Sequence, residues 1–231
     1  MRTITLLSTA LLLACSYSVA NDAAKVWIEG DRAFYHAEIS AENNKQLFDL
    51  AKTYPNKLKT LEIKSGGGDI HQGMDLGEYV FKNKLNVAVN SYCFSSCANY
   101  VFTAGNNKSL PYLKALGFHG GASIPGSEPD LSQVPQEFRE QAQKQLKQYM
   151  EKANNREAAF YDDIGVQQRI NSVGHLAQFE KQKQDFEFWY YSLEDLRSLG
   201  VRKVSLKPLG KRLPKDKQPK MLQIELSDIT P

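Results

Sequence analysis

The chain has 231 residues, 42% of them hydrophobic, and a formal net charge of +3 at pH 7. This length suits one domain, or one domain with an appendage, and the apolar content is ample for a buried core. So small a net charge argues against nucleic acid as the main partner, because binding to phosphates needs a dense face of Lys and Arg.

The first twenty residues have the pattern of a secretory signal. A single positive charge, Arg2, precedes a short apolar run through Leu13, and the small residues Ser18 and Ala20 suit cleavage after Ala20. The alternative is a lipoprotein signal that leaves Cys15 acylated. The run is too short for a permanent membrane anchor, and no later segment has a transmembrane pattern. We therefore expect a periplasmic or secreted protein.

After the signal, strand-like and helix-like segments alternate. Two short runs, "KVWIEG" and "FYHAEI", favour a hairpin or ribbon at the start of the domain. The expected elements that follow are a helix at 40–54 with Ser40 as its N-cap, a strand at 58–65, a helix at 70–84, a strand at 85–93, a helix at 96–105 and a strand leading into 119. This order predicts an α/β domain with right-handed crossovers, over residues 21–204.

Two further segments are distinctive. The stretch 132–163 predicts one long polar helix with an apolar stripe, and we expect its part at about 133–160 to project or to pack on a partner. A short helix follows, with Ser192 as its N-cap and Gly200 at its end. The tail at 205–231 is basic and contains prolines, so we expect it to be extended and flexible.

The cysteines point to a disulfide. If cleavage removes Cys15, only Cys93 and Cys97 remain of the 3 in the chain. In an oxidising compartment a pair of cysteines favours a bridge, which needs Cα atoms about 4.4–6.8 Å apart. Two cysteines do not close a structural zinc site, and the C-x3-C spacing differs from the C-x-x-C of redox sites. We expect no metal and no cofactor.

The same stretch places a serine at the start of a helix. The hydroxyl of Ser96 beside a helix N-terminus has the position of a nucleophile, and the N–H of Cys97 would then face a developing oxyanion. The alternative is an ordinary N-cap, the commonest reason for a serine at this place. Ser95 is the better N-cap if the helix begins one residue earlier, so both interpretations stay open.

Two more signals lie on either side of this serine. The sequence "SGGGD" at 65–69 follows a strand and opens a helix, where backbone N–H groups converge on a negative oxygen; a tight structural turn is the alternative. His119 ends the next strand, where α/β active sites form, and suits a general base, although a lone histidine is more often structural. We interpret His36, His71 and His175 as ordinary, with His71 at most at the rim of a site.

This order of glycine turn, serine and histidine resembles the Clp protease proteolytic subunit, in the ClpP/crotonase superfamily, over about residues 26–201. The family's Ser-Pro-Gly-Gly turn is matched by 65–68, and its nucleophile, nine residues before a glycine, is matched by Ser96 and Gly105. The family's Leu-Pro…His strand is matched by 110–119. The closing helix is echoed at 192–201, and the long helix takes the place of the family's projecting handle.

The resemblance implies a fold of stacked ββα units and a secreted serine peptidase or acyl hydrolase that acts on peptides or unfolded proteins. It implies Ser96 as nucleophile, His119 as base, and the amides of Gly68 and Cys97 as the oxyanion hole. It also implies a homo-oligomer.

This sequence departs from the family at three places. Gly66 replaces the proline of the turn, and the cysteines resemble a C-x-S-x-C element of secreted relatives in which Ser95 is the matched serine. The family's third catalytic residue falls near Phe188, so Glu187, or else Asp185, is the candidate acid. The alternative functions are a catalytically inactive ClpP-like binding or assembly protein, crotonase-like thioester chemistry and a thiol redox role.

Overall fold

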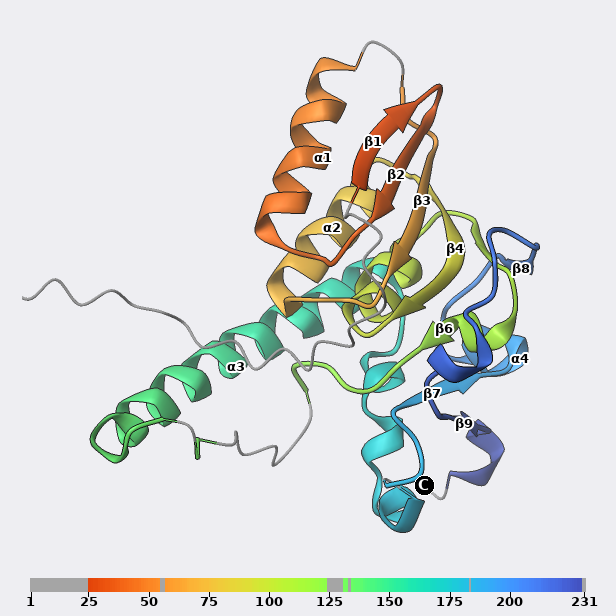
Figure 1. The fold of residues 1–231 in the computed structure, drawn as a ribbon. Coiled ribbons are helices and arrows are strands. Elements are labelled where there is room, and N and C mark those ends of the chain that lie inside the picture. The colour runs from red at the N-terminus through yellow and green to blue at the C-terminus, as the bar shows by residue number, and fades with distance from the viewer. Residues whose placement is uncertain (1–24, 55–56, 124–130, 133, 183, 230–231) are drawn as a thin grey trace, which may run out of the picture.

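The computed structural model describes residues 25–54, 57–123, 131–132, 134–182 and 184–229 (Figure 1). The expected signal segment 1–20, with Cys15 and the cleavage position after Ala20, lies outside the described residues.

Seven of the described strands form the central sheet, and β7 (Phe188–Tyr191) and β9 (Met221–Ile224) pair separately. Strands β1 (Lys25–Glu29) and β2 (Arg32–His36) are an antiparallel hairpin. The parallel part continues through β3 (Thr60–Ser65), β4 (Asn86–Phe94), β5 (Lys108–Leu110) and β8 (Val204–Leu206), in that order across the sheet. The short strand β6 (Leu116–Gly117) pairs with the carboxyl end of β4.

Two helices cover one face of this sheet. Helices α1 (Ala41–Thr53) and α2 (Ile70–Lys82) lie on the same side of β1–β4 in Figure 1. The N-cap of α1 is Ser40, whose side chain accepts from the Asn43 N–H, and Asp69 caps α2 in the same way. The expected general class, α/β with a mainly parallel sheet, is confirmed, as are these two helices.

The core lies between the sheet and these helices. Consecutive residues at 87–89 of β4 are all buried, which is typical of a strand covered on both faces. Fully buried side chains from β3, α2 and the segment after β4 pack together; they include Leu61, Ile63, Met74, Val80, Tyr100 and Phe102. This packing holds β3 and β4 against α2 and the segment that follows β4.

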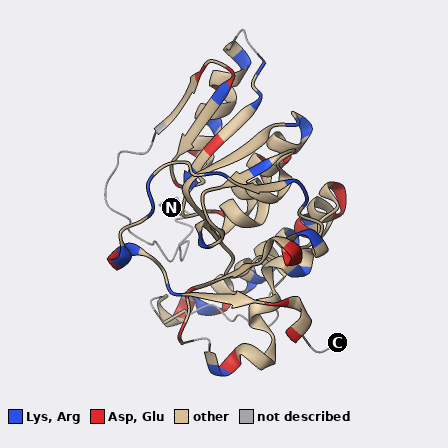
Figure 2. Cartoon of the chain, turned by 90° about the vertical axis from the view of Figure 1, so that its right-hand side faces the viewer, with Lys and Arg blue, Asp and Glu red and all other residues tan. Residues whose placement is uncertain are grey.

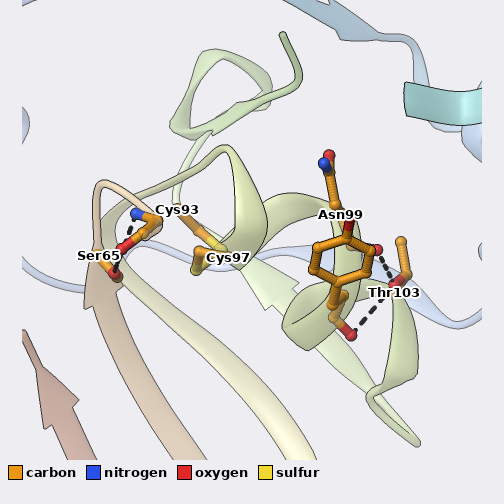
Figure 3. Close-up of a disulfide and its surroundings, with 7 residues drawn as sticks. Ser65, Cys93, Cys97, Asn99 and Thr103 are labelled. Carbon is orange, nitrogen blue, oxygen red and sulfur yellow. Dashed lines mark hydrogen bonds between the residues drawn. A yellow bond between two sulfur atoms is a disulfide. The ribbon is translucent and has the colours of Figure 1, made fainter. Parts of the chain in front are cut away.

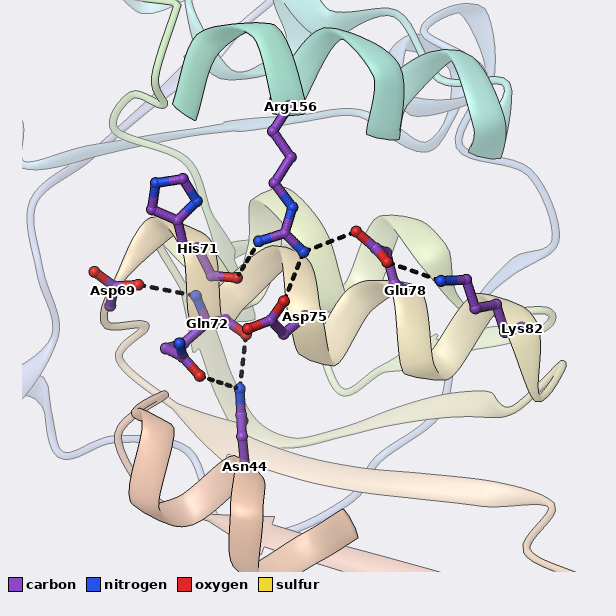
Figure 4. Close-up of polar contacts among 8 residues, drawn as sticks. All are labelled: Asn44, Asp69, His71, Gln72, Asp75, Glu78, Lys82 and Arg156. Carbon is purple, nitrogen blue, oxygen red and sulfur yellow. Dashed lines mark hydrogen bonds and ion pairs between the residues drawn. The ribbon is translucent and has the colours of Figure 1, made fainter. Parts of the chain in front are cut away.

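The long helix α3 (Gln136–Ile164) has two unlike halves. Its first half is largely exposed and leads away from the sheet, whereas Ala153, Phe160 and Tyr161 in its second half are buried. Figure 4 shows Arg156 reaching from α3 to α2, where its guanidinium lies 2.6 Å from Asp75 and 2.8 Å from Glu78. Only the amino-terminal half of the expected 133–160 helix therefore projects.

Parts of the described segment 205–229 pack against the body, where the sequence predicts a flexible tail at 205–231. Strand β9 (Met221–Ile224) pairs in parallel with β7 (Phe188–Tyr191), and helix α4 (Leu193–Ser198) follows β7. Leu213 and Ile224 are 8% and 0% exposed. Two apolar residues spaced among lysines and prolines thus bury their side chains against the body.

Charged residues of both signs are scattered over the fold (Figure 2), although the stretch 202–220 is mainly basic. Over the part of the chain that the structure describes, no helix combines the length and the apolar character needed to cross a membrane.

Candidate active site

A sharp turn joins β4 to the helical segment Cys97–Phe102, and Ser95 occupies it. We name Phe94–Cys97 the serine elbow. Ser95 has φ +56, a left-handed conformation that non-glycine residues rarely adopt, and its side chain is partly exposed. A strained strand-to-helix turn of this kind presents a nucleophilic side chain to the substrate.

The predicted disulfide is present and closes this elbow. Cys93 and Cys97 are bonded, with their Cα atoms 5.2 Å apart, and both residues are fully buried. Figure 3 shows the bridge beside Ser65, the residue that pairs with Cys93 across β3 and β4. The bond therefore ties the last residues of β4 to the first turn of the helix.

His119 reaches Ser95 from the neighbouring strand. Strand β6 pairs with the end of β4, and the next residue, Phe118, exchanges two backbone hydrogen bonds with Trp189 of β7. His119 then places its Nε2 atom 2.6 Å from the Oγ atom of Ser95. In the tautomer with a proton on Nδ1, the Ser95 hydroxyl donates to this nitrogen.

Ser96, the expected nucleophile, faces the other way. It has an ordinary helical φ of −54, is 2% exposed, and donates through its Oγ atom to the carbonyl of Gly68 at 2.8 Å. The left-handed backbone of Ser95 turns successive side chains in different directions. The structure thus pairs His119 with the alternative serine, Ser95, and gives Ser96 a buried contact.

The residues Gly66–Gly68, which we name the glycine turn, press against the serine elbow. A Cβ atom on Gly67 would lie 2.6 Å from that of Ser95 and 3.0 Å from the Ser96 nitrogen. The Gly67 carbonyl accepts from the Ile39 N–H at 2.7 Å, so the Gly68 N–H on the same trans peptide points away from Ile39. The glycine turn and the start of the helix therefore meet beside Ser95.

This placement changes the expected pair of oxyanion donors. If Ser95 reacts, the amide of the next residue belongs to Ser96, not to Cys97. Ser96 stands at the helix start, where backbone N–H groups lack an intrahelical acceptor. None of the hydrogen bonds between described residues uses the Gly68 N–H. The Gly68 amide therefore remains a candidate oxyanion donor, as expected, and the Ser96 amide replaces the Cys97 amide as the second one.

Neither candidate acid, Asp185 or Glu187, has its carboxylate at the His119 ring. Asp185 and Glu187 are exposed, and a carboxylate oxygen of Glu187 lies 3.4 Å from the backbone nitrogen of Lys220. It is the adjacent Phe188, the first residue of β7, that faces His119, with ring centroids 5.2 Å apart. Among the described residues, no hydrogen bond joins a carboxylate to the His119 ring.

The surroundings of His119 keep it neutral. The residue as a whole is exposed, but its ring packs against Phe188; desolvation of the ring, and secondly the nearby His175, lower the pKa of His119 below 6.5. His175, interpreted from sequence as ordinary, donates from Nε2 to the His119 carbonyl at 2.9 Å and so borders the site. A neutral imidazole is the form that accepts a proton.

The other two histidines lie elsewhere. The His71 ring packs on Tyr149 with centroids 4.9 Å apart, beside the glycine turn, and His36 lies near Glu62 on the sheet.

Sequence reasoning missed the residues that hold the loop after His119. Asn99 donates to the Gly120 carbonyl at 2.6 Å, and Glu157 accepts from the Ala122 N–H at 3.0 Å. One signal was present for Glu157, because this charged residue falls on the apolar stripe of α3 between Ala153 and Phe160.

Comparison with known proteins adds no relative, since neither a protein-family model nor a curated protein matches the chain.

Proposed function

We propose that the protein is a serine hydrolase of peptide or acyl substrates with a ClpP-like fold, in which Ser95 is the nucleophile and His119 the general base. The observation that carries this proposal is the 2.6 Å separation of Ser95 Oγ and His119 Nε2, at a left-handed strand-to-helix turn. The order of the glycine turn, the serine and the histidine along the chain supports the ClpP-like assignment.

The reaction needs only groups already described. The Ser95 oxygen attacks the substrate carbonyl carbon while its proton passes to His119 Nε2, and the carbonyl oxygen becomes an oxyanion beside the Ser96 and Gly68 N–H groups. The leaving amine or alcohol then departs with the proton from His119. Water, deprotonated by the same imidazole, then attacks the acyl carbon; the bond to Ser95 breaks, and the proton passes from His119 to the Ser95 oxygen.

The compartment and assembly belong to the same proposal. A buried disulfide suits an oxidising compartment, which supports a periplasmic or secreted protein. The exposed half of α3 supports self-association into a homo-oligomer, as in the family that the sequence resembles.

One observation favours a second candidate, an inactive ClpP-like binding or assembly protein. Within the described ranges the His119 ring has no carboxylate partner, and a third residue ordinarily orients the base. A scaffold of this kind hosts unrelated functions, so the site must be tested directly.

A fluorophosphonate probe separates the two candidates. In a hydrolase, the Ser95 oxygen attacks phosphorus, fluoride leaves and the proton passes to His119. We expect the wild-type protein to be labelled, Ser95→Ala to abolish labelling, His119→Ala to slow it by roughly a hundredfold or more, and Ser96→Ala to retain it. An unlabelled wild-type protein would support the inactive candidate, and label on Ser95→Ala would remove Ser95 from the mechanism.

A further inference from the structure

Glu157 is a carboxylate buried completely on the inner side of α3. Its Oε1 atom accepts from the Tyr100 hydroxyl at 2.5 Å, from the Asn171 amide at 2.8 Å and from the Ala122 N–H at 3.0 Å. Its Oε2 atom accepts from the Gln168 amide at 2.9 Å. The Oε1 atom thus accepts three hydrogen bonds and the Oε2 atom one, and each of these four contacts comes from a donor.

One side of this cluster is the loop that follows His119. A Cβ atom on Gly121 would lie 2.4 Å from Glu157 Oε1 and 2.1 Å from Asn171 Nδ2, so the loop backbone rests directly on these two side chains. The same loop is held by the bond from Asn99 to the Gly120 carbonyl and by the bond from His175 to the His119 carbonyl. The backbone around the imidazole is therefore fixed at several successive points.

We propose that Glu157 is a positioning residue for His119, acting through the backbone of residues 120–122. This inference rests on the proposed hydrolase function. A carboxylate that orients a catalytic histidine usually bonds to the ring itself. Here the carboxylate bonds to the backbone beyond the histidine, and the Nε2 atom is directed at Ser95 by where the loop is held.

The chemistry of the cluster requires an acceptor at this position. Every partner of Glu157 donates: a hydroxyl, two side-chain amides and a backbone N–H. Glutamine has nearly the same shape, but its NH2 group would face one of these donors and break that contact. Because the site is sealed from water, the loop would shift to relieve the conflict.

Glu157→Gln tests the proposal in the full-length protein. We expect the rate of fluorophosphonate labelling at Ser95 to fall roughly tenfold to a hundredfold, the loss that a displacement of about 1 Å produces at a reacting group. Hydrogen exchange of the Ala122 amide should accelerate in the same variant. The matched control is Glu151→Gln, an exposed carboxylate on the same helix, which should label at the wild-type rate.

A second variant reaches the same contact from the loop. Gly121→Ala places a methyl group against Asn171 Nδ2 and Glu157 Oε1, the two side chains on which the loop rests, and changes no residue of α3; we expect a similar slowing. Circular dichroism at the assay temperature shows whether each variant is folded. If Glu157→Gln is unfolded, Gly121→Ala provides the test. A folded variant with a lower melting temperature but wild-type labelling would overturn the positioning role alone. Failure of the wild-type protein to react would overturn the hydrolase proposal and this inference with it.

Discussion

The glycine turn and the serine elbow are both strand-to-helix connections, and they lie against each other. The first follows β3 and adopts left-handed conformations at Gly67 and Gly68, with φ +102 and +151. The second follows β4, places Ser95 at φ +56, and is closed by the Cys93–Cys97 disulfide.

The two connections reach unusual backbone geometry by opposite means. The glycine turn has no side chains, so its backbone approaches Ile39 and Ser95 too closely for a Cβ atom. The serine elbow keeps a side chain on its strained residue, the proposed nucleophile Ser95, and the single disulfide between Cys93 and Cys97 spans this residue. A functional residue in a strained turn therefore needs support that a glycine does not.

The largest effect should come from filling the glycine turn. Gly68→Ala places its methyl carbon 2.0 Å from the Ile39 carbonyl oxygen, so we expect the free energy of unfolding to fall by about 3 kcal/mol. Denaturant titration measures this change. Gly66→Ala is the matched control, because a Cβ atom there meets nothing within 4 Å. Equal stability of the two variants would mean that Gly68 does not make this close approach.

Opening the disulfide should have the next largest effect. The double variant Cys93→Ala/Cys97→Ala should lose about 2 kcal/mol of unfolding free energy, the value for closing so short a loop. Labelling of Ser95 should also slow, because the elbow relaxes. Wild-type protein treated with a reductant should approach the variant in both measurements. A double variant with wild-type stability and labelling would show that the elbow holds itself without the bond.

Removing the Ser96 hydroxyl, which joins the serine elbow to the glycine turn, should have a smaller effect on stability. Ser96→Ala removes the hydroxyl that donates to the Gly68 carbonyl, so we expect a loss of about 1 kcal/mol in unfolding free energy. A double-mutant cycle with Gly68→Ala should show coupling, since the two residues are in contact. Strict additivity of the two changes would contradict the contact.

The smallest effect should be the change in labelling rate with pH over the neutral range. The proposed base acts when neutral, and the pKa of His119 lies below 6.5 because of desolvation and His175. The labelling rate should therefore be constant from pH 8 down to about 6.5 and should fall only as the pH decreases through a midpoint below that value. His119→Ala should lack this limb. A wild-type midpoint at or above 6.5 would falsify the neutral, desolvated histidine.

The sequence by itself predicted most local structure near the site. The Ser40 cap predicted the start of α1, the apolar run at 85–93 predicted the buried strand β4, and the two cysteines predicted the bridge. These features depend on neighbours along the chain: a cap bonds within its own first turn, and the cysteines are four residues apart. Local physical chemistry was sufficient for them.

Only the tertiary structure decided which serine meets the histidine. Ser95 and Ser96 are adjacent and chemically identical, and the choice follows from a left-handed φ at Ser95 and from the pairing of β6 with β4. The position of Glu187, the contact of Glu157 with the Ala122 N–H and the pairing of β9 with β7 were also inaccessible from sequence. Each depends on contacts between segments far apart in the chain, and a one-dimensional pattern does not specify the directions in which those side chains meet.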